Sequence, residues 1–525
     1  MKKQIVLMIT AILLLIAQIP VTAQSGRVNP KTEAFSVEGD HEEASLPKAV
    51  GEEIAIPEMS NELDKEVVFH TDSVKLYDAT LGQPFNENEK AVRQKIIDGI
   101  KAYNEGISLF DFKITLSDLR TIIQDLHNSE SSLYMLENNY RYSTLNGYIY
   151  IYYPVYKMGE EESAAADAFV EEEIQKILND SGALLIEDDY LQALLLNDYI
   201  VSHYEYDTTY SNYNIYSMLK DKKGVCQAYT LLYDELLTRC GIEVTYAQSD
   251  AMNHIWNLVK IGDHYYHVDV TWNDPTKDRF GMAKHSYFML SDAAFLNNEN
   301  GAAHYNWISY DAIKCTDTTY DRSIVTTSVT SFVTDGEEVY YIENDSAEIL
   351  RYTDAFKKGE TIYKIEDRWY TRDDKGYYAG AFSGLVCFEG KLYFNTPKSI
   401  CTYDLKTKEV SRALTLEESK DIIAMRYDGN RTITYAIAPD PYSAISRLDT
   451  YMIPEAEIHT KGDVNQDGTI DMKDAAILQR QVLKIDEITD ETVLAAMDVT
   501  GDGIVDMKDA AKLTRFVIKV IDTLD

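Results

Sequence analysis

Cysteine and proline are both scarce in this chain of 525 residues, which has five cysteines and 11 prolines. An odd, irregularly spaced set of cysteines does not form a framework of paired disulfides, which excludes a small disulfide-stapled scaffold. At least one thiol must be free or paired with another chain, and the disulfide status is otherwise open. Beyond the first residues, no apolar run reaches the roughly 20 residues that cross a membrane, so no permanent membrane anchor is expected. The cysteines are Cys226, Cys240, Cys315, Cys387 and Cys401.

Positive charge is also in short supply. Lysine and arginine number 50 against 87 aspartates and glutamates, which gives a net charge of −37. A surface this acidic repels phosphate backbones, so nucleic acid is not expected as a partner and soluble cations are favoured. The hydrophobic fraction of 45% is ordinary for globular proteins. The length predicts three or four domains.

The N-terminus has the pattern of an export signal. Lys2 and Lys3 precede an apolar run over Ile5–Ala17, and Val21–Ala23 supplies the small residues of a cleavage site. We therefore predict a signal peptide over residues 1–23 and a secreted, extracellular protein. The next segment, residues 24–65, is predicted to be an acidic linker, because it is rich in Glu, Ser and Pro without a sustained period.

The rest of the chain divides by pattern into four predicted segments: 66–180, 181–318, 319–457 and 458–525. The first of them shows helical spacing at Asn86–Tyr103 and Ser117–Leu126, with Ser117 as the expected N-cap. A strand pattern follows at Tyr148–Tyr153. Helical spacing returns at Tyr190–Tyr204. This part of the chain is therefore predicted to be mixed α/β.

Short strands and turns dominate residues 319–457. Gly336, Gly390 and Gly429 each stand beside stretches rich in Tyr, Ile and Val, which predicts β-hairpins in a loose, partial propeller-like repeat. The spacing is uneven and the units are too few for a closed propeller. The aromatic side chains could bind a carbohydrate, and a Tyr-rich β-core explains them equally well, so both interpretations stay open.

The last segment contains two acidic loops in the same register. Each offers oxygen ligands at loop positions 1, 3, 5, 9 and 12, a main-chain carbonyl at position 7 and a glycine at the sharp turn, as in calcium loops. A single acidic turn could bind nothing, but two loops in register, each followed by the same amphipathic helix, indicate two Ca²⁺ sites. The first loop supplies Asp463, Asn465, Asp467, Thr469, Asp471 and Asp474, and the second supplies Asp498, Thr500, Asp502, Ile504, Asp506 and Asp509.

These paired loops and helices resemble a type I dockerin from Lys461 to Leu524. The resemblance implies binding to a cohesin domain of a scaffoldin in a cellulosome, among polysaccharide-degrading partners. Thr500 stands where Asp or Asn is usual, so we expect the second calcium site to be weaker. In the family, loop positions 10 and 11 help select the cohesin. They are Met472–Lys473 and Met507–Lys508 here, identical in both halves, so we expect either helix to face the partner.

A third pattern surrounds Cys226, which opens a predicted helix after Gly224 and Val225. At a helix N-terminus the macrodipole and the unpaired N–H groups stabilise a thiolate and can bind an oxyanion. Further on, His254 and Asp269 lie on two predicted strands of one hairpin. A cysteine nucleophile needs an imidazole for its proton and a carboxylate to orient that imidazole.

The motifs GVCQAY and HVDVTWNDP, with the His254 strand between them, resemble the transglutaminase-like superfamily over Tyr190–Pro275. The resemblance implies a papain-like core in which Cys226 is the nucleophile, His254 the base and acid, and Asp269 its orienting group. Tyr206 is a candidate second oxyanion donor or a core residue. The implied chemistry is acyl transfer through a thioester on a protein or peptide substrate, by a peptidase, deamidase or cross-linking enzyme.

The predicted fold class is multidomain: an α+β papain-like core, a β-rich domain and a small all-α calcium-binding dockerin. The alternative function is a catalytically inactive transglutaminase-like binding or adaptor protein of the cellulosome. A glycoside hydrolase is not expected, because no segment is long enough for a standard hydrolase domain.

Overall fold

The computed structural model describes residues 68–73, 84–274, 279–370, 376–417, 419–441, 443–454, 461–521 and 523–524. The predicted signal peptide and acidic linker lie outside these residues. The chain forms two compact units, residues 1–451 and 452–525, and each is described by itself. Within the described residues, no helix combines the length and the apolar character needed to cross a membrane.

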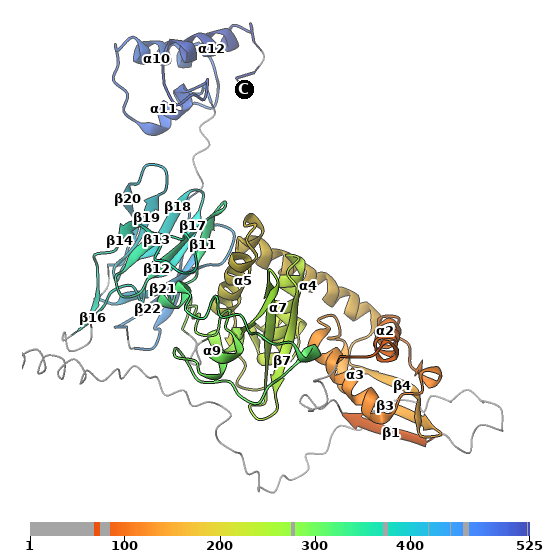
Figure 1. The fold of residues 1–525 in the computed structure, drawn as a ribbon. Helices are drawn as coiled ribbons and strands as arrows, with labels where there is room; N and C mark the ends of the chain where they lie inside the picture. Colours follow the sequence, from red (N-terminus) through yellow and green to blue (C-terminus); the bar gives the residue numbers. More distant parts are fainter. Residues whose placement is uncertain are drawn as a thin grey trace, which may run out of the picture. The chain divides into compact units, whose positions relative to one another are not determined.

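The first unit begins with an antiparallel sheet in the order β1-β3-β4-β2, packed against helices α2 and α3 (Figure 1). The N-cap of helix α3 lies two residues before the predicted one, because Thr115 rather than Ser117 caps the helix and forms a capping box with Asp118. The elements are β1 (Val68–Ser73), α2 (Glu87–Lys101), β2 (Ile107–Ser108), α3 (Leu116–Ser129), β3 (Leu136–Leu145) and β4 (Tyr148–Tyr156).

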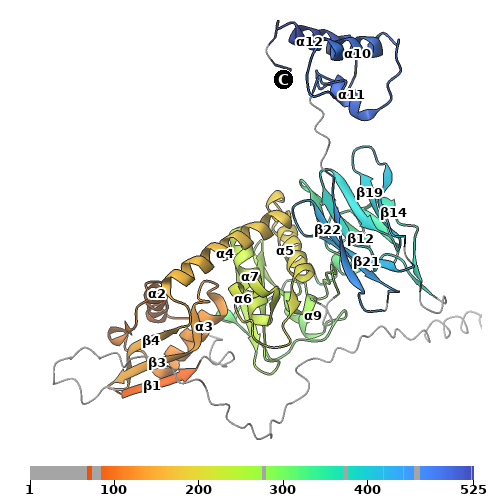
Figure 2. The ribbon, with the colours of Figure 1, turned by 180° about the vertical axis from the view of Figure 1, so that it is seen from behind.

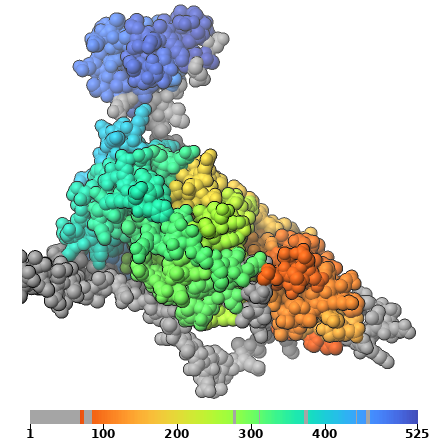
Figure 3. Space-filling model, viewed as in Figure 1, coloured from red at the N-terminus to blue at the C-terminus, as the bar shows by residue number. Residues whose placement is uncertain are grey.

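A layer of helices and a second antiparallel sheet, in the order β10-β7-β8-β9, form the middle of this unit (Figure 2). Helix α7 packs against β8, and its buried face joins a large cluster of Leu, Ile and Tyr side chains. The elements are α4 (Glu160–Asp180), α5 (Asp189–His203), β5 (Glu205–Tyr206), α6 (Ile215–Asp221), β6 (Lys223–Gly224), α7 (Cys226–Arg239), β7 (Val244–Ser249), β8 (His254–Ile261), β9 (His264–Val268), α8 (Val270–Asn273), α9 (Asp292–Leu296) and β10 (Ile308–Ser309). The segment after β9 is green in Figure 3, where it forms a broad part of the visible surface.

Small antiparallel sheets fill the rest of the first unit. The three predicted hairpins are confirmed, since Gly336, Gly390 and Gly429 lie in the turns between paired strands and each has a positive φ. The first sheet contains β11 (Val333–Asp335), β12 (Glu338–Glu343), β13 (Glu348–Arg351) and β14 (Glu360–Lys364), and a two-stranded sheet contains β15 (Trp369–Tyr370) and β16 (Tyr377–Tyr378). The next sheet contains β17 (Leu385–Phe388), β18 (Lys391–Asn395), β19 (Ser399–Asp404) and β20 (Val410–Thr415). The last sheet contains β21 (Asp421–Tyr427), β22 (Thr432–Ala438) and β23 (Arg447–Met452).

The C-terminal unit is helical and internally repeated. Helices α10 (Met472–Val482) and α12 (Met507–Val517) pack against each other, and α11 (Glu491–Met497) joins them. Asp471 and Asp506 cap the two long helices with the same capping box. The buried side chains repeat as well, since Ala475 and Leu478 match Ala510 and Leu513.

Candidate functional site: a buried cysteine, histidine and aspartate, and two acidic loops

Cys226 is the first residue of α7, and the chain leading into it is tightly placed. A Cβ added at Gly224 would come within 2.7 Å of the Met218 sulfur and 3.0 Å of the Ala228 Cβ, so any larger residue would require Met218 to shift. Val225 is the N-cap and offers no side-chain cap. The amides of the first turn are therefore not taken up by a capping side chain, and the helix dipole favours a thiolate at Cys226.

His254 and Asp269 form a short, buried contact. His254 Nε2 lies 2.6 Å from Asp269 Oδ2, and the two side chains are 1% and 0% exposed. Strand β9 ends at Val268, and Asp269 is the N-cap of the short helix α8, where its Oδ1 accepts the Trp272 amide. The prediction that Asp269 lies on a strand is therefore wrong, because its carboxylate caps a helix directly after Val268.

The charge of Asp269 is strongly stabilised. Burial alone would raise the pKa of this carboxyl, but the hydrogen bonds and charges of His254 and His304 hold it well below its ordinary range. Asp269 is therefore ionised, and a histidine facing it donates a proton through Nε2. For His254 this leaves Nδ1 as the nitrogen with the lone pair.

Thr230 ties the start of α7 to the start of β8. Its hydroxyl lies 2.8 Å from the Cys226 carbonyl oxygen and 3.2 Å from that of Ile255, the residue after His254. Asn257 donates to the Thr230 carbonyl at 3.1 Å. Cys226 and Ile255 also share one buried apolar cluster. The helix that carries the thiol and the strand that carries the imidazole are thus fixed to each other.

Helix α3, which packs against the first sheet, supports this site from the other side. The sequence did not predict this contact. Asp125 of α3 accepts the Tyr246 hydroxyl at 2.9 Å, and Tyr246 packs in the same cluster as Cys226. Gln227, the residue after the cysteine, donates to the His127 carbonyl at 2.6 Å. The end of α3 therefore rests on the first turn of α7.

A cavity of about 250 Å³ opens beside this contact. Its lining includes Gln227 of α7, Tyr213 just before α6, Glu130 just after α3 and Lys157 just after β4. Tyr206 pairs with Gly224 through the short parallel strands β5 and β6, which places it near Cys226. Burial raises the pKa of the Tyr206 hydroxyl, so it is a neutral donor.

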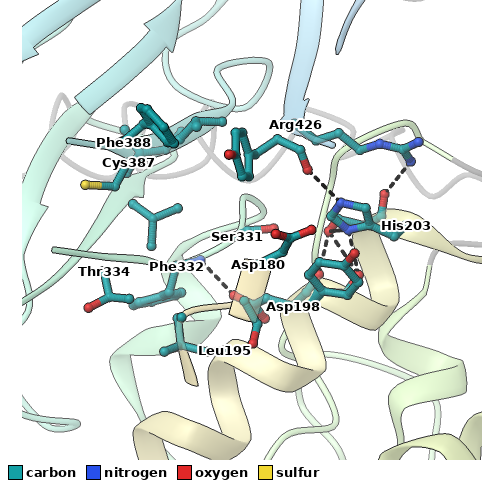
Figure 4. A pocket seen from close by; sticks show the side chains of 18 of the residues that line it. Asp180, Leu195, Asp198, His203, Ser331, Phe332, Thr334, Cys387, Phe388 and Arg426 are labelled. Atoms are coloured by element: carbon teal, nitrogen blue, oxygen red, sulfur yellow. Dashed lines mark hydrogen bonds between the residues drawn. The ribbon is translucent and has the colours of Figure 1, made fainter. Parts of the chain in front are cut away.

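A second cavity, of about 260 Å³, lies between α5 and the β-rich sheets (Figure 4). His203 Nε2 donates to the Tyr427 carbonyl at 2.8 Å, and Arg426 donates to the Ser202 carbonyl at 2.8 Å. Cys387 also lines it, but burial raises the pKa of this thiol to about 12. This cavity therefore lies between packed layers of the fold, and the cysteine that lines it is not activated.

One further cluster brings His267, Asp292 and Cys315 within ligating distance of one another. The Trp256 indole N–H donates to His267 Nδ1 at 2.9 Å, so His267 carries its proton on Nε2 and donates it to Asp292, also at 2.9 Å. No nitrogen lone pair is left for a metal. His267 is a buried strand residue and His264 an exposed one. All five cysteines are thiols, and none forms a disulfide.

The two acidic loops of the C-terminal unit have matching geometry. Asp463 accepts the amides of Asp467 and Gly468 at 3.1 and 3.0 Å, and Asp498 accepts that of Gly503 at 2.8 Å. Both glycines have φ near +80°, at +81° and +80°, a conformation that favours glycine. Each loop is thus wrapped around its first aspartate.

The position-12 aspartates, Asp474 and Asp509, are both 0% exposed. Each accepts loop amides, and Asp509 also accepts the Thr500 hydroxyl at 2.9 Å. Within the described residues, Lys473 and Lys508 are the basic side chains that approach the loop carboxylates, at 3.4–3.5 Å. A set of hard oxygen donors with surplus negative charge fits calcium.

Family models match two parts of the chain. Residues 181–270 match the transglutaminase-like superfamily, and residues 461–518 match the dockerin type I domain. The chain contains a transglutaminase-like domain and a type I dockerin domain. The transglutaminase-like match runs from Ser181 to Val270 and includes Cys226, His254 and Asp269. The dockerin domain includes both acidic loops.

Two solved structures resemble parts of this chain. One is the crystal structure of a TGase, with 12% identity, a TM-score of 0.19 and coverage of 24% of this chain and 42% of the other. The other is a candidate cysteine protease from Cytophaga hutchinsonii, with 15% identity, a TM-score of 0.18 and coverage of 27% and 60%. This chain therefore spans less than two thirds of either protein. No curated protein sequence matches it.

Proposed function

We propose that the transglutaminase-like domain is a cysteine enzyme that transfers or hydrolyses acyl groups of protein or peptide substrates through a thioester. One observation carries this proposal. The buried His254–Asp269 contact of 2.6 Å stands at the start of a strand that Thr230 ties to the first turn of α7, where Cys226 lies. This arrangement supports Cys226, His254 and Asp269 as nucleophile, base and orienting acid.

In the proposed reaction, His254 Nδ1 takes the proton of the Cys226 thiol, and the thiolate attacks the acyl carbonyl of an amide. The amides at the start of α7 stabilise the oxyanion, with Tyr206 as a candidate second donor. The C–N bond then breaks, and the His254 imidazolium returns the proton to the leaving amine. A thioester remains on Cys226. Water releases an acid in a peptidase or deamidase, and a primary amine gives a new amide in a cross-linking enzyme.

The function is tested by incubating casein and a primary-amine probe with the full chain under reducing conditions, followed by mass spectrometry. Amine incorporation identifies a transglutaminase, cleavage a peptidase, and a gain of about one mass unit at glutamine a deamidase. We expect Cys226→Ala to abolish the change. Cys240→Ala, which removes a half-buried thiol at the other end of α7, is the matched control and should retain it. Equal activity in both variants would contradict the proposal.

A non-catalytic binding or adaptor role is the second candidate, and one observation favours it. Cys226 is only 4% exposed, so the thiol is closed off from bulk solvent in this conformation. If neither casein nor a library of glutamine-containing peptides shows a Cys226-dependent change, the adaptor role is favoured.

We further propose that the protein is secreted and that its dockerin domain binds the cohesin domain of a scaffoldin in a cellulosome. The paired oxygen-rich loops support two Ca²⁺ sites, the second weaker through Thr500. The high negative charge speaks against a nucleic acid partner. This proposal keeps the predicted domain limits, which are 66–180, 181–318, 319–457 and 458–525. It also keeps the prediction that the secreted chain has no membrane anchor.

The repeated cohesin-facing residues predict two modes of docking. Met472 and Met507 are 53% and 57% exposed, so both helices present the same apolar side chain. We expect exchange of Met507–Lys508 for Asp–Asp to weaken cohesin binding less than threefold, because Met472–Lys473 can take over. Exchange of both pairs should abolish binding by calorimetry. Complete loss in the single exchange would contradict two equivalent modes.

A further inference from the structure

A second histidine, His304, shares the carboxylate of the proposed triad. It lies in the loop after α9, where its amide donates to the Phe295 carbonyl at 3.0 Å. Its side chain is 0% exposed, and its Nε2 lies 2.8 Å from Asp269 Oδ2. His254 Nε2 approaches the same oxygen at 2.6 Å. One carboxylate oxygen therefore accepts from two imidazoles.

Aromatic rings enclose His304. The centroids of Phe295 and Trp272 lie 3.9 and 4.2 Å from its own, and Trp256 stands edge-on at 4.9 Å. Its other nitrogen, Nδ1, is buried and makes no hydrogen bond to any described residue. The side chain thus has a single polar contact, to Asp269. Burial lowers the pKa of His304 to about 4, so the ring is neutral and donates from Nε2.

The two imidazoles are placed for different roles. His254 begins the strand that is tied to the Cys226 helix, whereas His304 lies within the aromatic cluster of Phe295 and Trp256. A ring held on several sides by aromatic groups does not reach a substrate. Its N–H instead fixes the Asp269 carboxylate, and it draws part of the negative charge of Oδ2 away from His254.

We propose that His304 is a positioning residue of this site, which holds Asp269 in place and sets how strongly that carboxylate stabilises protonated His254. The inference rests on the proposed cysteine chemistry. Without the His304 donor, Asp269 should interact more strongly with the imidazolium, because its charge is no longer shared. The thiolate–imidazolium pair then persists to higher pH, while the freed carboxylate can rotate and turnover falls.

The test measures alkylation of Cys226 in the full chain by iodoacetamide across pH, followed by mass spectrometry of the peptide that contains it. We expect His304→Leu to move the alkaline limb of the profile upward by roughly one pH unit. This variant should also have lower turnover. His304→Gln, which keeps an N–H donor, should show a pH profile and a turnover close to those of the wild type. His285→Leu is the matched control, because it removes another buried histidine, paired with Asp198 at 2.8 Å, and should leave the limb unchanged.

Each outcome separates the inference from the proposed function. A folded His304→Leu variant with the wild-type limb overturns the positioning role, and so do equal shifts in the Leu and Gln variants. A wild-type Cys226 that reacts like an ordinary thiol overturns the proposed function instead. Should His304→Leu not fold, nitrogen NMR of the wild type decides: His304 must stay neutral and Nε2-protonated wherever Cys226 reacts, and its titration there overturns the inference.

Discussion

Replacing Asp269 by asparagine is expected to lower Cys226-dependent turnover by about 10³–10⁴-fold. The carboxylate accepts three N–H donors: His254 and His304 at Oδ2, and the Trp272 amide at Oδ1. An amide has one oxygen and one NH₂, so at least one donor must face another donor. If His254 loses its acceptor, its proton moves to Nδ1, and the nitrogen that should take the thiol proton no longer can.

The measurement is kcat with the amine probe, and the control is Asp292→Asn. Asp292 also accepts from a buried histidine, His267, at 2.9 Å, but it takes no part in the proposed chemistry. We expect the control to retain activity within threefold. The Asp269 carboxylate also stabilises the fold above its unfolded pKa of about 3.9, and this contribution is lost as pH falls toward its lower folded value. Turnover within tenfold of wild type in Asp269→Asn would contradict the proposed role.

Removing calcium is expected to abolish cohesin binding, with a loss of about 100-fold or more in affinity. Asp474 and Asp509 carry carboxylates at 0% exposure, and each loop holds three further aspartates. Without a cation these charges repel one another, so the loops lose their order. A ligand present at 100 times its dissociation constant stabilises a folded state by about 2.7 kcal/mol. The dockerin domain should therefore melt at lower temperature after chelation.

Calorimetry of the full chain gives the sharper readout, with two Ca²⁺ expected in the wild type. Asp474→Asn should remove the first site and Asp509→Asn the second. Asp486→Asn, which breaks only the exposed pair with Arg480 at 2.6 Å, is the control and should retain both. Unchanged stoichiometry in the two loop variants would contradict the assignment of the loops.

The sequence predicted the parts of the site that depend on local patterns. The apolar periodicity predicts the helix that begins at Cys226, and the alternation of apolar and polar residues predicts the strand that holds His254. The fixed spacing of acidic residues predicts the two acidic loops. His304 could not be predicted, because it lies in an irregular loop and meets Asp269 only through tertiary packing. The only signal for it is a histidine among aromatic residues, next to Tyr305 and close to Trp307.

Two further features could be recognised only from the folded structure. The end of β9 was missed because the Asp269 side chain caps α8, a contact that outweighs the strand propensity of the residues after it. The support of Cys226 by α3 was missed because the contact between Gln227 and His127 joins residues about 100 positions apart. Local periodicity carries no information about such pairs.

The five thiols differ in a way that bears on oxidative damage. Burial raises the pKa of Cys240, Cys315 and Cys401, and raises that of Cys387 to about 12. Peroxide attacks thiolates, so the raised pKa protects these four sulfurs chemically, although Cys240 and Cys387 are only half-buried. Cys226 alone has a helix N-terminus that favours the anion. We therefore expect an oxidant to inactivate the protein by oxidising Cys226 alone to a sulfenic acid. A reducing agent should reverse this oxidation, and the fold should stay intact.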